Sequence, residues 1–495
     1  MLDQAQIDTL RHQPVAARGL LIDGATGPSE DGQTLDVISP IDGTVLTTTA
    51  AGTRDDTARA VAAARAAFED GRWRNMPPAA RKRILLAWAD LIEAEALALT
   101  VLGVRDNGTE IGMAIKAEAG SAVATIRYYA EAIDKLYGEI APTSPDFMGL
   151  IHREPLGVVA AIISWNFPLM IGAWKLGPAL AVGNSVVLKP SESASLSLLR
   201  VAELALEAGL PPGVLNVVTG RGDVVGDALA RSMDVDAVVF TGSGATGRRL
   251  LAASAESNLK RCYLELGGKS ANVVFSDAPD LGEAAKVSAG GIFRNSGQVC
   301  VAGSRLLVEC AIHDDFVAEL ARAAAAMSVG DPLDTATQSG AVNNLTQLEQ
   351  NLAFVETAQA EGGTLYQGGE RLLEDTGGYY MAPTIITDVA AAHTVAQQEV
   401  FGPVLAVTAF DTEDEAMALA NSTVFGLAGG LWTANLGRAH RCIRAMKTGV
   451  VHVNTYGGPD VTVPMGGVGQ SGNGVDKSLH AFDKYTDLKT AWIKL

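Results

Sequence analysis

Short apolar runs alternate with amphipathic runs through the middle of the chain. Each apolar run has the length of a buried strand, whereas the segments between them repeat apolar residues at helical spacing. The predicted strands are 158–163, 185–188, 214–218, 237–240 and 263–266, and the predicted helices are 169–182, 195–208 and 246–255. This order predicts an α/β fold with a parallel sheet covered by helices on both faces.

The first 140 or so residues carry mainly helical patterns after an extended start. Residues 1 to about 50 contain turn signals around short β-like pieces, so we expect them to be extended. Thr53 and Asp56 have the spacing of a capping box before an Ala-rich run. Further helices are predicted over 81–100 and 117–136.

Later parts of the chain add a second α/β segment and two isolated strands. A strand is predicted at 272–275, and strand–helix alternation continues to about residue 450. Alternating runs at 147–153 and 488–495 predict strands that would form a small projecting unit. Because such a unit is marginal alone in water, we expect it to pair with another subunit.

Polar residues follow all five predicted strands of the first segment. In parallel sheets of this kind, ligands bind beyond the carboxyl ends of the strands. Five such positions in succession favour a nucleotide crevice over ordinary turns; they are Trp165 and Asn166, Lys189 and Glu192, Thr219 and Gly220, Thr241 to Ser243, and Glu265.

The glycines at 242–247 fit the GxGxxG fingerprint of dinucleotide-binding folds. Gly242, Ser243 and Gly247 lie between a predicted strand and a predicted helix, and Glu265 follows roughly 20 residues later, where the fingerprint places a ribose-binding acid. In a second interpretation Glu265 is a catalytic base and Glu192 binds the ribose. Both interpretations imply a dinucleotide, and the residues alone leave both open.

Cys300 follows a loop of small and amide residues, Arg294 to Val299, after a helical run at 281–291. Glycine and asparagine in such a loop permit close backbone approach and supply hydrogen-bond donors, which a reactive thiolate needs. The alternative interpretation is a small buried apolar residue, as most free cysteines are.

Composition narrows the range of partners. The chain has 495 residues, 48% of them hydrophobic, and a formal net charge of -18, which argues against nucleic-acid and anionic-membrane partners. Four scattered cysteines and the lack of a signal-like start predict reduced thiols in the cytoplasm. The seven histidines form no HExxH motif or ligand-like cluster with the cysteines, so we expect no metal.

Seven motifs in order make the chain resemble the aldehyde dehydrogenase superfamily over nearly its whole length. They are Ser164-Trp165-Asn166-Phe167-Pro168, Leu188-Lys189-Pro190-Ser191-Glu192, Phe240-Thr241-Gly242-Ser243, Leu264-Glu265-Leu266-Gly267-Gly268-Lys269, Phe293 to Cys300, Glu399-Val400-Phe401-Gly402-Pro403 and Pro464-Met465-Gly466-Gly467. Within the family, residues 128–135 and 472–480 are similar to a polyamine-catabolic branch that includes γ-glutamyl-γ-aminobutyraldehyde and 4-guanidinobutyraldehyde dehydrogenases.

The resemblance implies a Rossmann-type cofactor domain, an α/β catalytic domain and a small β oligomerisation unit. The implied NAD-binding domain comprises 1–136 and 156–266, and the catalytic domain comprises 267–479. Residues 137–155 and 480–495 would be the oligomerisation strands of a homodimer or homotetramer.

The resemblance also implies a role for each site residue. Cys300 would attack the aldehyde, Asn166 and the Cys300 backbone N–H would bind the oxyanion, and Glu265 would activate water. NAD is the expected cofactor, because a carboxylate at Glu192 repels a 2′-phosphate. NADP is the second candidate, because Lys189 and Arg221 are cationic neighbours. The implied cofactor-binding residues are Trp165, Lys189, Glu192, Gly242, Ser243, Gly247, Glu399 and Phe401; Lys175 and Asp476 match a proton relay suggested for some relatives.

Two positions bear on the substrate. Met465 stands where the family has a phenylalanine that lines the substrate pocket, and Asp460 is placed to face a cationic tail or to be an ordinary loop aspartate. We expect an ω-amino, γ-glutamylamino or guanidino aldehyde. The alternatives are another aldehyde of the betaine or semialdehyde type and a non-catalytic NAD-binding relative; a CoA-acylating enzyme is disfavoured because such relatives generally lack the base that Glu265 supplies.

Overall fold

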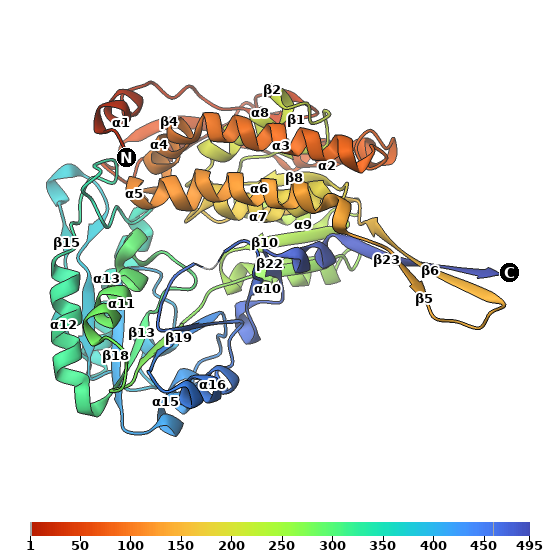
Figure 1. Ribbon diagram of the computed structural model, residues 1–495. Helices are drawn as coiled ribbons and strands as arrows, with labels where there is room; N and C mark the ends of the chain where they lie inside the picture. Colours follow the sequence, from red (N-terminus) through yellow and green to blue (C-terminus); the bar gives the residue numbers. More distant parts are fainter. Residues whose placement is uncertain (1, 459) are drawn as a thin grey trace.

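The computed structural model describes residues 2–458 and 460–495, and it contains two seven-stranded sheets and a projecting three-stranded sheet (Figure 1). Met1 and Pro459, which fall inside the predicted domain ranges, lie outside the described residues.

The first sheet has the strand order β11-β10-β7-β8-β9-β1-β2. All neighbours from β11 to β9 are parallel, and β1 adds antiparallel to β9. Chain order runs outward in opposite directions from the β7–β10 boundary, which is the switch point where ligands bind in such sheets. The strands are β7 (Val158–Ile162), β8 (Ser185–Lys189), β9 (Leu215–Val217), β10 (Ala237–Thr241), β11 (Arg261–Glu265), β1 (Leu20–Ile22) and β2 (Ala25–Gly27).

The five strands predicted for this sheet are confirmed to within a few residues, and so are the helices between them. The helices are α7 (Pro168–Ala181), α8 (Leu196–Glu207) and α10 (Gly244–Ala255). Strands β7 and β8 are buried along their whole length, which explains why they are continuously apolar rather than alternating.

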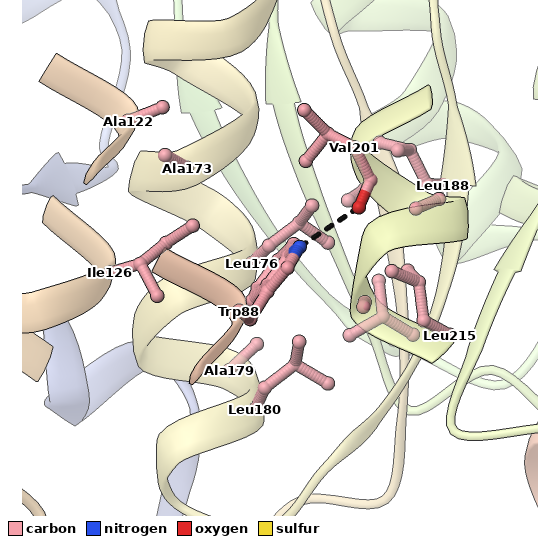
Figure 2. Packing of buried hydrophobic residues seen from close by; sticks show 14 of the residues in the cluster. Trp88, Ala122, Ile126, Ala173, Leu176, Ala179, Leu180, Leu188, Val201 and Leu215 are labelled. Atoms are coloured by element: carbon pink, nitrogen blue, oxygen red, sulfur yellow. Dashed lines mark hydrogen bonds between the residues drawn. The ribbon is translucent and has the colours of Figure 1, made fainter. Parts of the chain in front are cut away.

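One face of the first sheet is covered by a large apolar core. Figure 2 shows Trp88 of α3 (Pro78–Ala94) wedged between α7 and α8, with its indole N–H donating to the Val201 carbonyl at 2.8 Å. A buried indole needs such a partner, because an unpaired polar group costs free energy. The residues around it come from four elements: Ile126 of α6 (Ser121–Ala132), Leu176 and Leu180 of α7, Leu188 of β8 and Leu215 of β9.

The N-terminal region differs from its prediction in three places. An unpredicted helix, α1 (Gln4–Arg11), opens the region expected to be extended and is capped by Asp3. The predicted helix over 81–100 is two helices, α3 and α4 (Ala96–Asn107), that break at Glu95. The predicted helix over 117–136 begins with a π-helical turn at 115–120 before α6. The Thr53–Asp56 capping box of α2 (Arg54–Glu69) is confirmed.

The second sheet has the order β14-β17-β18-β13-β12-β19-β20 and is parallel apart from the β14–β17 pair. The predicted strand at 272–275 is β12 (Ala271–Val274). Its other strands are β13 (Arg305–Glu309), β14 (Thr364–Gln367), β17 (Thr384–Thr387), β18 (Val404–Phe410), β19 (Ala428–Trp432) and β20 (Val450–Val453), and its main helices are α11 (Leu281–Phe293), α12 (His313–Ala325), α13 (Leu345–Ala360), α15 (Glu413–Ala420) and α16 (Leu436–Ala445).

The projecting sheet confirms the two predicted isolated strands. β23 (Thr486–Lys494) pairs antiparallel with β6 (Phe147–Pro155) along its whole length, and β5 (Glu139–Ala141) adds on the other side of β6. The unit extends away from the rest of the molecule (Figure 1) and exposes Leu488 and Trp492 by 62% and 60%.

No helix within residues 2–458 and 460–495 is both long enough and apolar enough to cross a membrane.

Candidate active site

The loop before Cys300 turns sharply because three successive residues adopt left-handed backbone conformations. Asn295, Ser296 and Gly297 have φ values of +50°, +49° and +71°. At Gly297 a side chain is excluded, since a Cβ would lie 2.1 Å from the Gly402 carbonyl oxygen. The turn follows α11 and places Cys300 in the wall of a cavity, half-buried and packed against the edge of the apolar core.

Asn166 reaches this loop from the carboxyl end of β7. Its Nδ2 donates to the Gln298 carbonyl at 2.9 Å, and its Oδ1 accepts from the Ser164 hydroxyl at 2.9 Å. One of the two Nδ2 hydrogens is used in this way, so the second is available to the cavity that Asn166 and Cys300 both line.

Glu265 is the last residue of β11, directly opposite Thr241 of β10. The side chain is buried, lines the same cavity, and its Oε1 has no hydrogen-bond partner among the described residues. Burial and the nearby Asp476 carboxylate raise the pKa of Glu265 well above its usual range. A carboxylate with a raised pKa is a stronger base than an ordinary one, which suits a general base.

Asp476 is held by two ammonium groups. It belongs to β22 (Val475–Asp476), is fully buried, and accepts hydrogen bonds from Lys175 and Lys484. Burial opposes the charged form of Asp476, but the two cations outweigh it and lower the pKa of this carboxyl. The same cations offset part of the rise at Glu265.

The cavity has a volume of about 740 Å³, and its wall combines apolar side chains with the polar groups above. Burial, followed by the carboxylates of Glu265 and Glu399, raises the pKa of the Cys300 thiol to about 12. The thiol is therefore protonated at neutral pH, so its attack on a carbonyl requires a group that takes the proton.

A second group of side chains lies at the carboxyl ends of β8 and β10. The buried Lys189 ammonium lies 3.3 Å from the half-exposed Glu192 carboxylate. Burial lowers the pKa of Lys189, and Glu192 opposes that change. After β10, Gly242 leads into Ser243, whose hydroxyl caps the N-terminus of α10, and at Gly247 a Cβ would come within 2.9 Å of the Leu266 side chain.

The second sheet presents its amino ends to the same region, where the resemblance led us to expect Glu399 and Phe401. The Glu399 carboxylate, upstream of β18, accepts a hydrogen bond from the Gly268 N–H at 2.9 Å, and burial raises the pKa of Glu399 to about 7. Phe401 has φ +58°, and its ring meets Trp165 edge-on with centroids 5.2 Å apart. At Gly268 a Cβ would lie 2.5 Å from the Cys300 carbonyl oxygen.

The structure thus brings Cys300, Asn166 and Glu265 to one cavity wall and arranges the other predicted residues along the facing sheet ends. Lys484 and Glu110, which also shape this region, carry no sequence signal that distinguishes them from ordinary helix and loop residues, whereas Asn295 belongs to the loop that the sequence singled out. Within residues 2–458 and 460–495, no group of three or more His, Cys, Asp or Glu side chains is placed to hold a metal ion.

The chain is similar to several known aldehyde dehydrogenases. The chain is 48% identical over 476 residues to the NADP/NAD-dependent aldehyde dehydrogenase PuuC of Escherichia coli (strain K12), covering 96% of this chain and 95% of that protein. The fold matches a crystal structure of indole-3-acetaldehyde dehydrogenase complexed with NAD+ at a TM-score of 0.98 and 48% identity, with both chains fully covered.

The γ-glutamyl-γ-aminobutyraldehyde dehydrogenase of Burkholderia cenocepacia J2315 also matches with a TM-score of 0.98, at 47% identity and over the full length of both chains. A profile of the Aldehyde dehydrogenase family matches residues 28–491. The chain therefore belongs to the aldehyde dehydrogenase family.

Proposed function

We propose that the protein oxidises an aldehyde to a carboxylate with NAD(P), using Cys300 as the nucleophile, Asn166 as an oxyanion-binding residue and Glu265 as the general base. The observation that carries the proposal is that these three side chains, far apart along the chain, line one cavity. A non-catalytic NAD-binding relative has no need for all three together.

In the first half of the reaction, the Cys300 thiol gives its proton to water in the cavity, and its sulfur adds to the aldehyde carbon and forms a tetrahedral thiohemiacetal. The Cys300 backbone N–H and the free Nδ2 hydrogen of Asn166 are the donors for its oxyanion. Bound nicotinamide supplies the hydride acceptor for the oxidation. The acyl group then remains on Cys300 as a thioester.

In the second half, Glu265 takes a proton from water, whose oxygen attacks the thioester carbon and displaces the Cys300 sulfur. The Glu265 oxygen without a partner, Oε1, is the atom we assign to this water. Protonated Glu265 gives this proton to the Cys300 sulfur, and the acid product loses its own proton to solvent and leaves as the carboxylate. Asp476 and its two lysines provide buried charged groups beside the base, which supports the relay suggested by the resemblance.

The residues at the sheet ends fit a dinucleotide. Lys189 and Glu192 would bind the adenosine ribose hydroxyls, and the α10 N-terminus with Gly242, Ser243 and Gly247 would face the pyrophosphate. Glu399 would bind the nicotinamide ribose, with Phe401 and Trp165 beside the ring. The proposal favours NAD over NADP, since the Glu192 carboxylate would repel a 2′-phosphate.

The substrate we propose is an ω-amino, γ-glutamylamino or guanidino aldehyde. One support is the similar Burkholderia protein, a γ-glutamyl-γ-aminobutyraldehyde dehydrogenase. Another is Asp460, an exposed carboxylate that lines the cavity. Met465 is buried in the cavity wall. Betaine aldehyde and semialdehydes are the alternatives within the same mechanism.

An aldehyde panel tests this substrate assignment. We expect kcat/KM for 4-guanidinobutyraldehyde and 3-aminopropionaldehyde to exceed that for hexanal. Asp460→Asn should reduce the preference by about twofold to fivefold, as expected for one exposed charge pair. Both cofactors are used in NADH or NADPH absorbance assays. Preference for hexanal would reject the cationic substrate, and folded, NAD-binding protein without any turnover would favour the binding-only relative.

We also propose the implied division into a cofactor domain (1–136 and 156–266), a catalytic domain (267–479) and oligomerisation strands (137–155 and 480–495).

The exposed apolar side chains of the projecting sheet support a homodimer or homotetramer. Light scattering should give a multiple of the 51.4 kDa chain mass, and Leu488→Asp with Trp492→Asp should lower it. A monomeric parent protein would contradict the proposed oligomer.

All four cysteines are free thiols, which supports a reducing cytoplasmic location.

A further inference from the structure

A buried carboxylate with no role in the proposed mechanism lies beside the nucleophile loop. Glu110 follows α4 and immediately precedes the short helix α5 (Ile111–Ala114). Its side chain is 3% exposed and lines the wall of the active-site cavity. A charged group is costly to bury, so its partners indicate what it holds.

The main partner of Glu110 is the backbone of the turn that precedes Cys300. The Asn295 N–H donates to both carboxylate oxygens, at 3.1 and 3.3 Å. Asn295 and Ser296 are both left-handed, and such non-glycine residues persist only where their surroundings hold them. The neighbouring Thr109 hydroxyl donates to Asn295 Oδ1 at 2.8 Å. Two consecutive residues therefore bind Asn295, Glu110 at its backbone N–H and Thr109 at its side chain.

The Asn295 side chain of this turn contacts the residues that would bind the oxyanion. Asn295 Nδ2 lies 3.4 Å from the Asn166 carbonyl oxygen and 3.3 Å from the Gln298 carbonyl oxygen, and donates to both. The Gln298 carbonyl also accepts from Asn166 Nδ2. The orientation of the Asn166 amide therefore depends on where Asn295 places the loop that leads to Cys300.

We propose that Glu110 is a positioning residue: its carboxylate fixes the left-handed turn at Asn295, which in turn aligns the Asn166 amide and the Cys300 backbone N–H for the same oxyanion. This inference rests on the proposed function. A carboxylate suits the task because both oxygens accept, and charged acceptors make stronger hydrogen bonds. Burial raises the pKa of Glu110 to about 7, and the hydrogen bond from the Asn295 N–H and the nearby Arg294 charge oppose that rise.

Kinetics of two variants test the role. Glu110→Ala should lower kcat by at least about tenfold, because a misaligned oxyanion donor loses its effect, while KM for NAD stays within about twofold. Glu110→Gln keeps one oxygen that accepts from Asn295 N–H, so it should retain kcat within about threefold of wild type. A wild-type kcat in Glu110→Ala, or an equal loss in Glu110→Gln, would overturn the proposal.

Hydrogen exchange gives a readout that does not require turnover. The peptide spanning Arg294 to Cys300 should exchange faster in Glu110→Ala than in wild type or Glu110→Gln. Glu309→Ala is the matched control, because Glu309 accepts the Ser276 N–H at 2.6 Å, outside the cavity. Unchanged exchange in a folded Glu110→Ala would contradict the assigned contact.

Thr109→Val is the second variant, for use if Glu110→Ala does not fold. It removes the donor to Asn295 Oδ1 with little change in volume, and it should lower kcat with an unchanged KM for NAD. Normal kcat and normal exchange in Thr109→Val would overturn the proposal. A wild-type protein inactive on every aldehyde would reject the proposed function alone, since exchange still reports whether Glu110 holds the turn.

Discussion

Replacement of Cys300 by alanine should abolish aldehyde oxidation and leave cofactor binding unchanged. The methyl group occupies the same site without a sulfur to form the thiohemiacetal, and loss of a nucleophile that acts together with its base costs on the order of 10⁴-fold or more in kcat. Lys189, Glu192 and the α10 N-terminus are untouched. Steady-state NADH formation and a calorimetric Kd for NAD measure the two expectations.

The control for this variant is Cys310→Ser. Cys310 is an exposed free thiol that does not line the cavity, so its replacement should change neither kcat nor the Kd for NAD. A Cys300→Ala protein that keeps a tenth or more of wild-type activity would show that another group attacks the aldehyde. Because the Cys300 pKa is raised to about 12, iodoacetamide should alkylate this thiol in wild type faster as the pH rises.

Glu265→Gln should stop the reaction after its first half. Glutamine keeps the shape of the side chain but cannot accept a proton from water, and removal of a general base costs about 10² to 10⁴-fold. A rapid-mixing experiment should therefore show a burst of NADH close to one equivalent per site, followed by slow turnover. Hydroxylamine, which attacks thioesters without a base, should restore part of the steady-state rate.

The pH dependence follows from the raised pKa of Glu265. A carboxyl group with a raised pKa stays protonated to higher pH, and only its ionised form accepts a proton. Thioester hydrolysis in wild type should therefore rise with pH through that pKa, whereas the residual rate of Glu265→Gln should lack this rise.

Glu192→Gln separates the two interpretations of the glycine fingerprint. If Glu192 binds the ribose, this variant raises KM for NAD and leaves the NADH burst and kcat at saturating cofactor intact. If instead Glu265→Gln raises KM for NAD without slowing turnover at saturation, Glu265 is the ribose ligand and the assigned base is wrong.

Five strands of the first sheet were predictable because most of their residues are apolar and polar residues lie at or after their carboxyl ends. β7, β8 and β10 each combine a buried run with a polar or charged residue at or just after the carboxyl end, and both features are local in sequence. The break at Glu95 between α3 and α4 was not predictable from spacing, because the apolar repeat continues across it.

Other parts of the site depend on contacts between distant segments and leave no local pattern. Glu110 sits in a polar loop, and its burial arises only when Asn295 packs against it, 185 residues later. Lys484 looks like an ordinary charged residue until it meets Asp476. Glu399 was expected in the site from its motif, but its contact with Gly268, 131 residues away in sequence, leaves no local pattern.

The segment from Ser471 to Lys484 closes the open edge of the first sheet beside Glu265. The Leu266 N–H donates to the Ser471 carbonyl, and the Leu264 carbonyl accepts from the N–H groups of Asn473 and Gly474. The Leu264 N–H donates to the Asn473 side-chain oxygen, and Asp476 follows shortly after. The environment of Glu265, formed by Asp476 and Lys484, is therefore complete only after the ribosome has translated past residue 484. Prematurely terminated chains, and chains clipped by a protease within this stretch, would lack the machinery to consume a reactive aldehyde.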